Sequence, residues 1–282
     1  MLGRCRVMCR VALYASAEDP GYLRYISRCF RLSSLNDFVL DRYRRGHRAH
    51  THGWGYAYVY SSFNELGLSL YKTSLPITAD GINMPLIPRH FDWIFMILHS
   101  RLTTEKSIDV LNSHPYYFHQ PGKISIWLAH NGSLDKEKLA KDLNMESLTK
   151  NYSDSYFLTQ WLGRNISSMD IEDFRSIIKD IVNKIAELGI LKSALNFVAI
   201  VLDELEKKVL GLAINYIAED YMNLFDYYTL YKADIGRKSV AIVSSTVALY
   251  LNKLYGFKAE PLSNRTIVIM YPHRESIEVE IH

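Results

Sequence analysis

The sequence predicts an α+β fold in which two mostly antiparallel sheets are sandwiched between layers of helices. Strand patterns occupy the first part of the chain, helical patterns follow in the middle, and strand patterns return in the last third. Hydrophobic residues make up 48% of the 282 positions, which is enough for a sizeable core. No internal repeat or low-complexity linker interrupts this order. We therefore expect one continuous domain over residues 9–282.

In the first half of the chain, short apolar runs rich in β-forming residues alternate with segments of helical spacing. The predicted strands cover residues 10–16, 56–60, 66–71, 93–98 and 123–129. A turn at Pro20-Gly21 precedes two predicted helices at residues 22–30 and 35–43, and a loop covers residues 47–55. Polar stretches follow the last two strands directly. Groups at strand ends are often functional, because a rigid sheet fixes them in place.

The second half begins with helices and ends with strands. The clearest helix covers residues 171–188, with Asp170 as a candidate cap at its start and Gly189 at its end. The other predicted helices are residues 134–143 and 155–162, and the predicted strands are residues 194–202, 209–217, 227–233, 238–244 and 266–270. Residues 203–207 have the composition of a hairpin turn between two of these strands.

Bulk properties exclude several classes of protein. The net charge is only +3, with both signs mixed along the chain, so no nucleic-acid partner is expected. No apolar run reaches the roughly 18 residues that span a bilayer, and Arg10 interrupts the first apolar stretch, so neither a membrane partner nor a signal peptide is expected. Three cysteines cannot form a full disulfide framework. Together these features predict a cytoplasmic protein.

Cys9 is the candidate nucleophile, because a cysteine at a chain terminus carries its own base. A free thiol titrates near about 8.5, and an α-amino group near about 7.7–8.0, so the amine can accept the thiol proton. This requires removal of Met8. Residues 1–8 are accordingly a mis-assigned start, with translation beginning at Met8, or a propeptide; we favour the first. The alternative for Cys9 is a buried structural thiol that opens a strand.

Three downstream stretches hold groups that suit an amino-acid substrate. Arg101 offers a planar fork for a carboxylate, and Thr104 could donate a hydrogen bond to the same group. Asn131 and Gly132 could donate the two N–H groups of an oxyanion hole, and Asp154 could accept an ammonium group. Each has a structural alternative. Arg101 could form a surface salt bridge, and Thr104 could cap the end of a strand. Asn131-Gly132 could form a hairpin turn, and Asp154 could be the N-cap of a helix.

Histidines crowd one loop of the chain, where His47, His50 and His52 lie close together. Imidazole is a common metal ligand. The sequence, however, has no cysteine pair and no His-Glu-x-x-His helix with the spacing of a zinc site. We therefore expect no metal and no other cofactor, and we interpret His99 and His130 as packed residues at strand ends.

Taken in order, five segments resemble the class II glutamine amidotransferases, which are N-terminal nucleophile hydrolases. The segments are Met8-Cys9-Arg10, His52-Gly53-Trp54-Gly55-Tyr56-Ala57, His99-Ser100-Arg101 with Thr104, His130-Asn131-Gly132-Ser133 and Ser153-Asp154-Ser155. Each motif is weak alone, and their joint order and spacing are specific. The resemblance extends from Cys9 to about residue 162, and the later strands are similar to the second half of stand-alone members.

The resemblance implies a four-layer αββα sandwich and a role for each matching position. Cys9 would attack the side-chain amide of glutamine, and Asn131 and Gly132 would hold the oxyanion. Arg101 and Thr104 would bind the α-carboxylate, and Asp154 would bind the α-ammonium group. The sequence departs from the family pattern in its extension before Cys9, in His52 where an acid is usual, and in Tyr156 where glutamate is usual.

Three functions fit these observations. The first is hydrolysis of glutamine or another γ-glutamyl amide, with ammonia passed to a separate synthetase subunit or with a different leaving group. The second is a catalytically inert binding subunit that retains residues 1–8. The third is an N-terminal nucleophile hydrolase for acyl amides, against which Arg101 and Asp154 argue, because together they suit a zwitterion.

Overall fold

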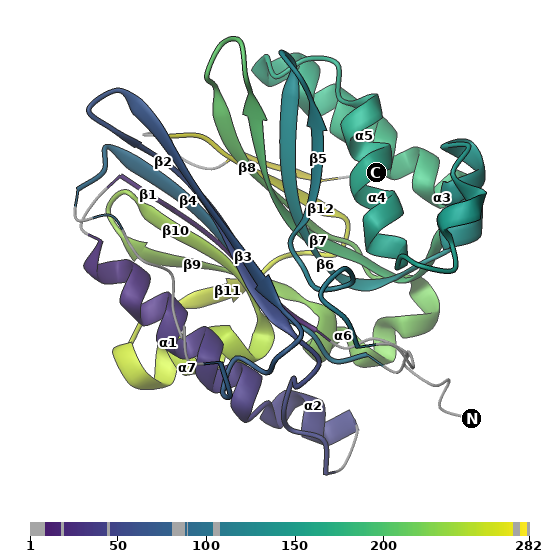
Figure 1. Ribbon diagram of the computed structural model, residues 1–282. Helices are drawn as coiled ribbons and strands as arrows, with labels where there is room; N and C mark the ends of the chain where they lie inside the picture. The colour runs from purple at the N-terminus through teal and green to yellow at the C-terminus, as the bar shows by residue number, and fades with distance from the viewer. Residues whose placement is uncertain are drawn as a thin grey trace.

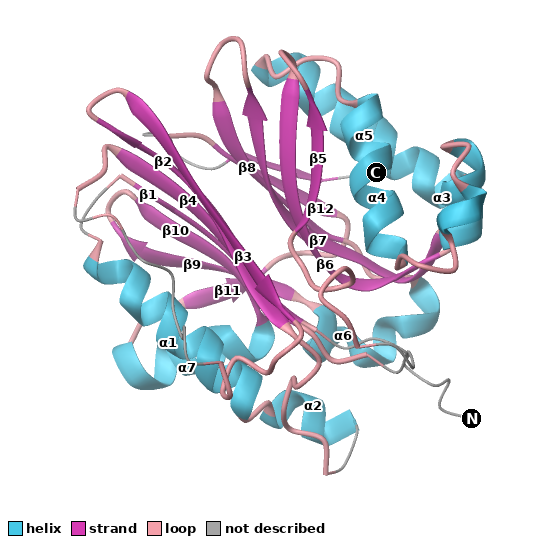
Figure 2. Ribbon diagram, in the orientation of Figure 1, coloured by secondary structure: helices cyan, strands magenta, loops and turns pink. Residues whose placement is uncertain are grey.

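A computed structural model gives the fold of the chain (Figure 1). It describes residues 9–17, 20–43, 46–80, 88, 90–103, 108–272 and 277–280. The predicted sandwich is confirmed, because two antiparallel sheets lie face to face with helices outside both of them (Figure 2).

The first sheet has seven strands in the order β11-β9-β10-β1-β4-β2-β3, and every neighbouring pair is antiparallel. Its strands are β1 (Arg10–Ser16), β2 (Trp54–Ser62), β3 (Glu65–Thr73), β4 (Trp93–Ser100), β9 (Leu230–Gly236), β10 (Ser239–Ser244) and β11 (Ala259–Pro261). The start of β1 pairs with the end of β4, because Arg10 lies opposite Ser100. This register brings residue 9 close to the segment that follows β4.

The second sheet has six strands in the order β13-β12-β8-β7-β6-β5, again antiparallel throughout. Its strands are β5 (Tyr116–Gln120), β6 (Ile124–Leu134), β7 (Leu191–Asp203), β8 (Val209–Asn215), β12 (Thr266–Met270) and β13 (Ile277–Glu280). The strand β6 continues through Asn131 and Gly132, which lie opposite Asn196 and Leu195 of β7. The Asn-Gly pair is therefore inside a strand, and the hairpin-turn alternative is wrong.

Helices cover the outer face of each sheet (Figure 2). The first sheet is covered by α1 (Gly21–Leu35) and α7 (Ser245–Tyr255), with the short helices α2 (Phe38–Tyr43) and α6 (Phe225–Tyr228) at one end. The second sheet is covered by α3 (Lys136–Asp142), α4 (Asp154–Asn165) and α5 (Ile171–Glu187). Short 3₁₀ turns occupy Glu146–Leu148 and Glu219–Leu224.

The alternation of side chains along β1 separates two cores. Val11 and Leu13 pack between the sheets, whereas Ala12 and Tyr14 pack against the helices outside the first sheet. Successive residues of a strand point to opposite faces. If the same alternation extends to the residues before Val11, Arg10 points toward the helices and Cys9 points into the space between the sheets.

Several elements differ from the sequence prediction. The segment 245–255 has a β-branched, apolar start and was not predicted as a helix, yet it forms α7, which ends at Gly256 in a left-handed conformation (φ 73°). The strands β5, β11 and β13 were also not predicted. Residues 225–228, which include the start of the predicted strand 227–233, form α6 before β9 begins. Asp170 occupies the N-cap position of α5, but its side chain makes no capping hydrogen bond.

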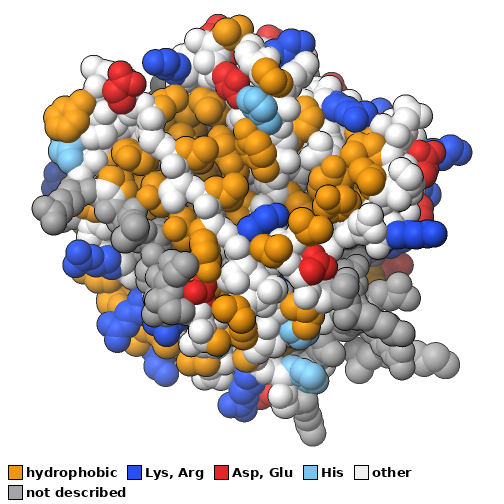
Figure 3. Space-filling view, in the orientation of Figure 1, with side chains coloured by type: hydrophobic (Ala, Val, Ile, Leu, Met, Phe, Trp, Pro, Cys, Tyr) orange, Lys and Arg blue, Asp and Glu red, His pale blue; other side chains and the backbone are white. Residues whose placement is uncertain are grey.

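The two sheets leave part of their apolar interior open at one edge. In Figure 3, apolar side chains gather between the β2–β3 hairpin and β5; β3 is an edge strand of the first sheet and β5 an edge strand of the second. Leu68, Leu70 and Tyr117 of these edge strands are between 42% and 54% exposed. Within the described ranges, no helix has the length and hydropathy needed to cross a bilayer.

Candidate active site

Cys9 lies directly before β1 and is fully buried. Its backbone nitrogen donates a hydrogen bond to Oδ1 of Asn131 (3.0 Å), and Tyr227 Oη donates to its carbonyl oxygen (3.2 Å). The thiol Sγ lies 3.9 Å from the carbonyl oxygen of Leu102. Cys9 therefore contacts both Leu102, which follows β4 of the first sheet, and Asn131, which lies in β6 of the second sheet.

Asn131 uses only one end of its side-chain amide. Its Oδ1 accepts the N–H of Cys9, while its Nδ2 is buried and has no hydrogen-bond partner among the described residues. A buried amide donor without a partner is costly, since desolvation is not compensated. This donor is therefore available for a negatively charged oxygen beside Cys9.

Gly132 is required by the close approach of a neighbouring strand. A Cβ atom at this position would lie 1.9 Å from the carbonyl oxygen of Ala194 in β7. No side chain fits there without a shift of the backbone. The glycine therefore has a packing reason of its own, beside the role that its N–H could have in catalysis.

Arg101 follows β4 and is 3% exposed. Its peptide N–H donates to Gly53 (2.8 Å) and its carbonyl accepts from His52 (3.0 Å), so its backbone is fixed against the loop before β2. Its positive charge lowers the pKa of the Cys9 thiol. The surface salt bridge that the sequence left open is wrong for this buried residue. Thr104, the second expected carboxylate donor, lies outside the described residues.

Asp154 is the first residue of α4, and Ser153 rather than Asp154 occupies the N-cap position. The carboxylate accepts the backbone N–H of Leu134 (2.7 Å) and of Ser155 (2.8 Å). The first of these bonds ties the start of α4 to the end of β6, just beyond Gly132. The negative charge of Asp154 raises the pKa of the Cys9 thiol.

Burial raises the pKa of the Cys9 thiol to about 11, against the smaller lowering effects of the Leu102 carbonyl and Arg101. The thiol is therefore protonated at neutral pH and needs a base. The one hydrogen bond of Sγ to a described residue is with the Leu102 carbonyl. His130, the neighbour of Asn131 in the chain, is held by Ser155 Oγ (3.0 Å) and the Ala194 carbonyl (3.1 Å). No described histidine takes the place of the base.

The segment Asn112-Ser113-His114-Pro115 contacts two of the motif segments, although the sequence analysis did not single it out. The His114 ring stacks on His99, with centroids 3.9 Å apart. Asn112 Oδ1 accepts the N–H of Ser153 (2.8 Å), which positions the residue before Asp154. A polar run between two apolar strands was the available signal for this segment.

We expect acid to destabilise the fold through His99 and His114. Burial lowers both pKa values well below 6.5, so the unfolded chain binds more protons below about pH 6.5. Their contribution is complete above that pH and is lost progressively as the pH falls. The midpoint of thermal unfolding should drop between pH 8 and pH 5.5, and His114→Phe should reduce that slope. His47→Gln, at an exposed position, should not. A midpoint that does not change with pH would contradict the assignment.

Two histidines of residues 47–52 form hydrogen bonds to different parts of the fold. His50 Nε2 bonds to Asp37 (2.8 Å), and His52 Nδ1 accepts the N–H of Thr103 (2.9 Å). A cavity of about 410 Å³ lies between this loop and the Leu102-Thr103 segment. In the part of the chain that the structure describes, no group of three or more His, Cys, Asp or Glu side chains could hold a metal ion.

Solved structures with the same fold include two enzymes of nucleotide metabolism. One is the glutamine phosphoribosylpyrophosphate amidotransferase of B. subtilis, complexed with ADP and GMP, with a TM-score of 0.62 at 15% identity. The other is described as an allosteric regulatory enzyme of purine biosynthesis, with a TM-score of 0.60 at 13% identity. Both matches cover 97% of this chain and 49% of the other, so the chain spans about half the length of these enzymes.

No curated protein matches the sequence. The family model for class-II glutamine amidotransferases matches residues 25–199, which is more than half of the 282 residues. The matched segment begins after Cys9 and contains Arg101, Asn131, Gly132 and Asp154. With this match and the sandwich of two antiparallel sheets, the chain belongs to the class-II glutamine amidotransferases, which have the fold of the N-terminal nucleophile hydrolases.

Proposed function

We propose that the protein hydrolyses the side-chain amide of glutamine or of a related γ-glutamyl compound, with Cys9 as an N-terminal nucleophile. The main support is the amide of Asn131. One end of it accepts the N–H of Cys9, and the other end is a buried donor with no partner among the described residues. This arrangement suits an oxygen that gains negative charge as the thiol attacks.

The amino-acid end of the substrate is assigned to Arg101 and Asp154. Their opposite charges both act on the Cys9 thiol; Arg101 directly follows β4, and Asp154 is the first residue of α4. Arg101, with Thr104, binds the α-carboxylate, and Asp154 accepts the α-ammonium group. A pair of fixed opposite charges favours a zwitterion over a simple acyl amide.

In the first half of the reaction, Sγ of Cys9 attacks the Cδ atom of glutamine, and the thiol proton passes to the α-amine of Cys9. The carbonyl oxygen becomes an oxyanion, which accepts hydrogen bonds from Asn131 Nδ2 and the Gly132 N–H. When this intermediate collapses, the C–N bond breaks and the nitrogen leaves as ammonia with the proton from the α-ammonium group. A glutamyl thioester remains on Cys9.

In the second half, a water molecule attacks the thioester while the α-amine takes one of its protons. The tetrahedral intermediate expels the thiolate, which regains that proton, and glutamate leaves. The balance is one glutamine and one water consumed for one glutamate and one ammonia. A separate synthetase subunit is the proposed acceptor of ammonia, and another γ-glutamyl amide would release an amine in its place.

The mechanism requires a free amine on Cys9. We therefore propose that residues 1–8 are absent from the active protein, that residues 9–282 form one amidotransferase domain, and that it works in the cytoplasm. Three cysteines without a disulfide framework support that compartment. The intact mass of the protein purified from its native cells tests the first point, because a chain beginning at Cys9 is expected.

A glutamine analogue that carries a diazoketone in place of the amide tests the assignment directly. We expect the analogue to label one residue, Cys9, because of the two described cysteines this is the one that lies before β1 and contacts Asn131 and Leu102. Peptide mass spectrometry should find the adduct on the peptide that contains Cys9, and excess glutamine should protect it. Labelling at Cys29, or labelling that glutamine does not prevent, would contradict the proposed site.

Replacing Arg101 with lysine is expected to weaken glutamine binding. A lysine keeps the charge but replaces a planar, two-pronged donor with a point charge. KM for glutamine should rise by about tenfold, while kcat changes much less, because the carboxylate lies away from the reacting bond. Steady-state kinetics would measure both constants. Arg175→Lys, on the outer helix α5, is the control and should leave KM unchanged. An unchanged KM in Arg101→Lys would remove Arg101 from the site.

A second candidate function is a catalytically inert binding subunit. Two observations favour it. In the sequence as it stands, Met8 precedes Cys9, so the Cys9 nitrogen is a peptide nitrogen, and burial raises the pKa of its thiol to about 11. Such a chain would bind glutamine through Arg101 and Asp154 without consuming it. Isothermal titration combined with an ammonia assay separates binding from turnover.

A further inference from the structure

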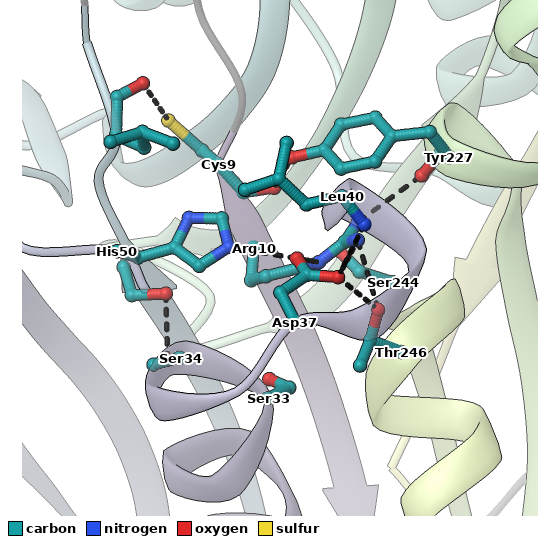
Figure 4. A network of polar contacts seen from close by, with 12 residues as sticks. Cys9, Arg10, Ser33, Ser34, Asp37, Leu40, His50, Tyr227, Ser244 and Thr246 are labelled. Carbon is teal, nitrogen blue, oxygen red and sulfur yellow. Dashed lines mark hydrogen bonds and ion pairs between the residues drawn. The ribbon is translucent and has the colours of Figure 1, made fainter. Parts of the chain in front are cut away.

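A buried network of charges lies directly behind the candidate nucleophile (Figure 4). Arg10 follows Cys9 in the chain, points to the opposite face of the sheet and is fully buried. Its Nε and Nη2 atoms donate to the two carboxylate oxygens of Asp37, at 2.5 and 2.8 Å. This bidentate geometry is the strongest form of an arginine–carboxylate pair.

Three further hydrogen-bond donors contact the carboxylate of Asp37. His50 Nε2 lies 2.8 Å from Oδ2, while Thr246 Oγ1 (2.6 Å) and the Leu40 N–H (2.9 Å) donate to Oδ1. Burial alone raises the pKa of Asp37, but the charge of Arg10 and the bonds from His50 and Arg10 lower it well below its usual range. The carboxylate is therefore ionised and saturated with hydrogen bonds. Its position between α1 and α2 also explains why the helix predicted over residues 35–43 begins only at Phe38.

Tyr227 connects Arg10 to the backbone of Cys9. Arg10 Nη1 donates to the Tyr227 carbonyl (3.1 Å), and its guanidinium lies 4.1 Å from the centre of the Tyr227 ring. The hydroxyl of the same tyrosine donates to the carbonyl oxygen of Cys9 (3.2 Å). Residues 9 and 10 are thus held together from outside the first sheet.

Thermodynamic stability alone does not account for this network. Removing two charges from water is expensive, and a buried ion pair is often no more stabilising than apolar side chains of similar volume. The network does provide a fixed position, because it joins the first residue of β1 to the starts of α2 and α7 and to α6. The first residues of a chain otherwise tend to fray.

We propose that Arg10 and Asp37 are positioning residues, which hold the first residue of the active chain so that its thiol faces the Asn131 amide and the amino-acid clamp. This inference rests on the proposed function, in which Cys9 is the chain terminus. In that form no residue precedes Cys9, and its position depends on residue 10 and on the bonds to Asn131 and Tyr227. A displacement of about 1 Å at a reacting atom can cost on the order of 100-fold in rate.

Two variants separate positioning from folding. Arg10→Met removes the guanidinium but leaves the charge of Asp37 buried, which can unfold the protein. The double variant Arg10→Met/Asp37→Leu removes both charges together, so neither charge is left buried and unpaired, and its thermal unfolding is measured beside that of the parent to show that it folds. Arg175→Met, which breaks an exposed ion pair with Glu172 on α5, is the matched control. All are compared with their parent in whichever form of the chain, retaining residues 1–8 or beginning at Cys9, hydrolyses glutamine.

We expect kcat of the double variant to fall on the order of 100-fold, while KM changes by less than about threefold, because Arg101 and Asp154 come from other elements. Labelling by the diazoketone analogue, which needs the thiol aligned with bound substrate, should slow by a similar factor. Labelling by iodoacetamide, which needs no alignment, should change much less. Arg175→Met should match the parent in all three measurements.

Each other outcome overturns the inference. An unchanged kcat in the folded double variant shows that Cys9 is positioned without the ion pair. Equal slowing of both labelling reagents indicates a change in thiol reactivity or access rather than position. If neither form of the parent hydrolyses glutamine, the proposed function fails, and the inference fails with it; an active parent with equally active variants refutes the positioning role alone.

Discussion

Replacing Cys9 with alanine is expected to abolish glutamine hydrolysis, with a loss on the order of 10⁴-fold or more. The sulfur is the only protein atom in the proposed mechanism that bonds to the carbonyl carbon of the substrate, and a water molecule that enters its space has neither its nucleophilicity nor its placement. Because Cys9 is fully buried and small, the variant should fold and still bind glutamine. An ammonia assay and glutamine titration on the same preparation would measure the two properties separately.

The other two cysteines are the controls for this experiment. Cys29 lies in α1 among apolar side chains outside the first sheet, and burial raises the pKa of its thiol to about 12. Cys5 belongs to the segment that the active chain is proposed to lack. Cys29→Ala and Cys5→Ala should therefore keep full activity. Equal loss in Cys5→Ala and Cys9→Ala would mean that the wrong thiol has been assigned.

The second large effect is expected from the eight residues before Cys9. A peptide nitrogen cannot accept a proton, so a chain that retains Met8 has no base beside a thiol whose pKa burial raises to about 11. We expect the form that begins at Cys9 to hydrolyse glutamine on the order of 10²–10⁴ times faster than the form that retains residues 1–8, the usual contribution of a general base.

The comparison needs two preparations of the same chain, one translated from Met1 with its extension verified by intact mass, and one translated from Met8 and trimmed by methionine aminopeptidase. Initial rates of ammonia release at pH 7.5 give the ratio. Equal rates in both forms would show that the α-amine is not the base. In that case a group outside the described residues would have to take its place, and the mechanism would need revision.

The two expected effects follow from one geometric fact, the contact between Cys9, directly before β1 of the first sheet, and Asn131 in β6 of the second. Cys9 N–H reaches Asn131 Oδ1 across the space between the sheets. The same contact fixes which way the Asn131 amide faces, since an amide has one accepting and one donating end. Loss of either partner therefore disturbs both the nucleophile and the oxyanion donor.

Much of the fold could be predicted from local sequence patterns. The strand over residues 10–16 is confirmed with the same ends, and the helix over residues 171–188 is confirmed to within one residue. These elements have strong periodicity, which reports directly which face is buried. The prediction failed where local preference and tertiary contacts disagree. No element was predicted over residues 245–255, whose start contains the β-branched Thr246 and Val247, yet these residues form a helix that packs against α1.

Two features of the site could not be predicted from the sequence and became visible only in the tertiary structure. An Asn-Gly pair is typical of a hairpin turn, and only the pairing of β6 with β7 shows that Asn131 and Gly132 lie within a strand. Arg10 entered the sequence analysis as part of the Met8-Cys9-Arg10 motif, as the start of a strand and as an interruption of an apolar run, but it was given no role in the site. Its partner Asp37 is 27 residues away, and nothing local indicates that the two meet in a buried pair.

The sequence alone determined the fold class, the order of most elements and the residue types of the site, because periodicity and chemical identity are local properties of the chain. The tertiary structure decided which of those residues meet. Antiparallel pairing set the register that brings residue 9 beside the end of β4, and the packing of two sheets brought Asn131 to its nitrogen. It also decided the burial that governs the thiol, since the free energy of a charge depends on every element packed around it.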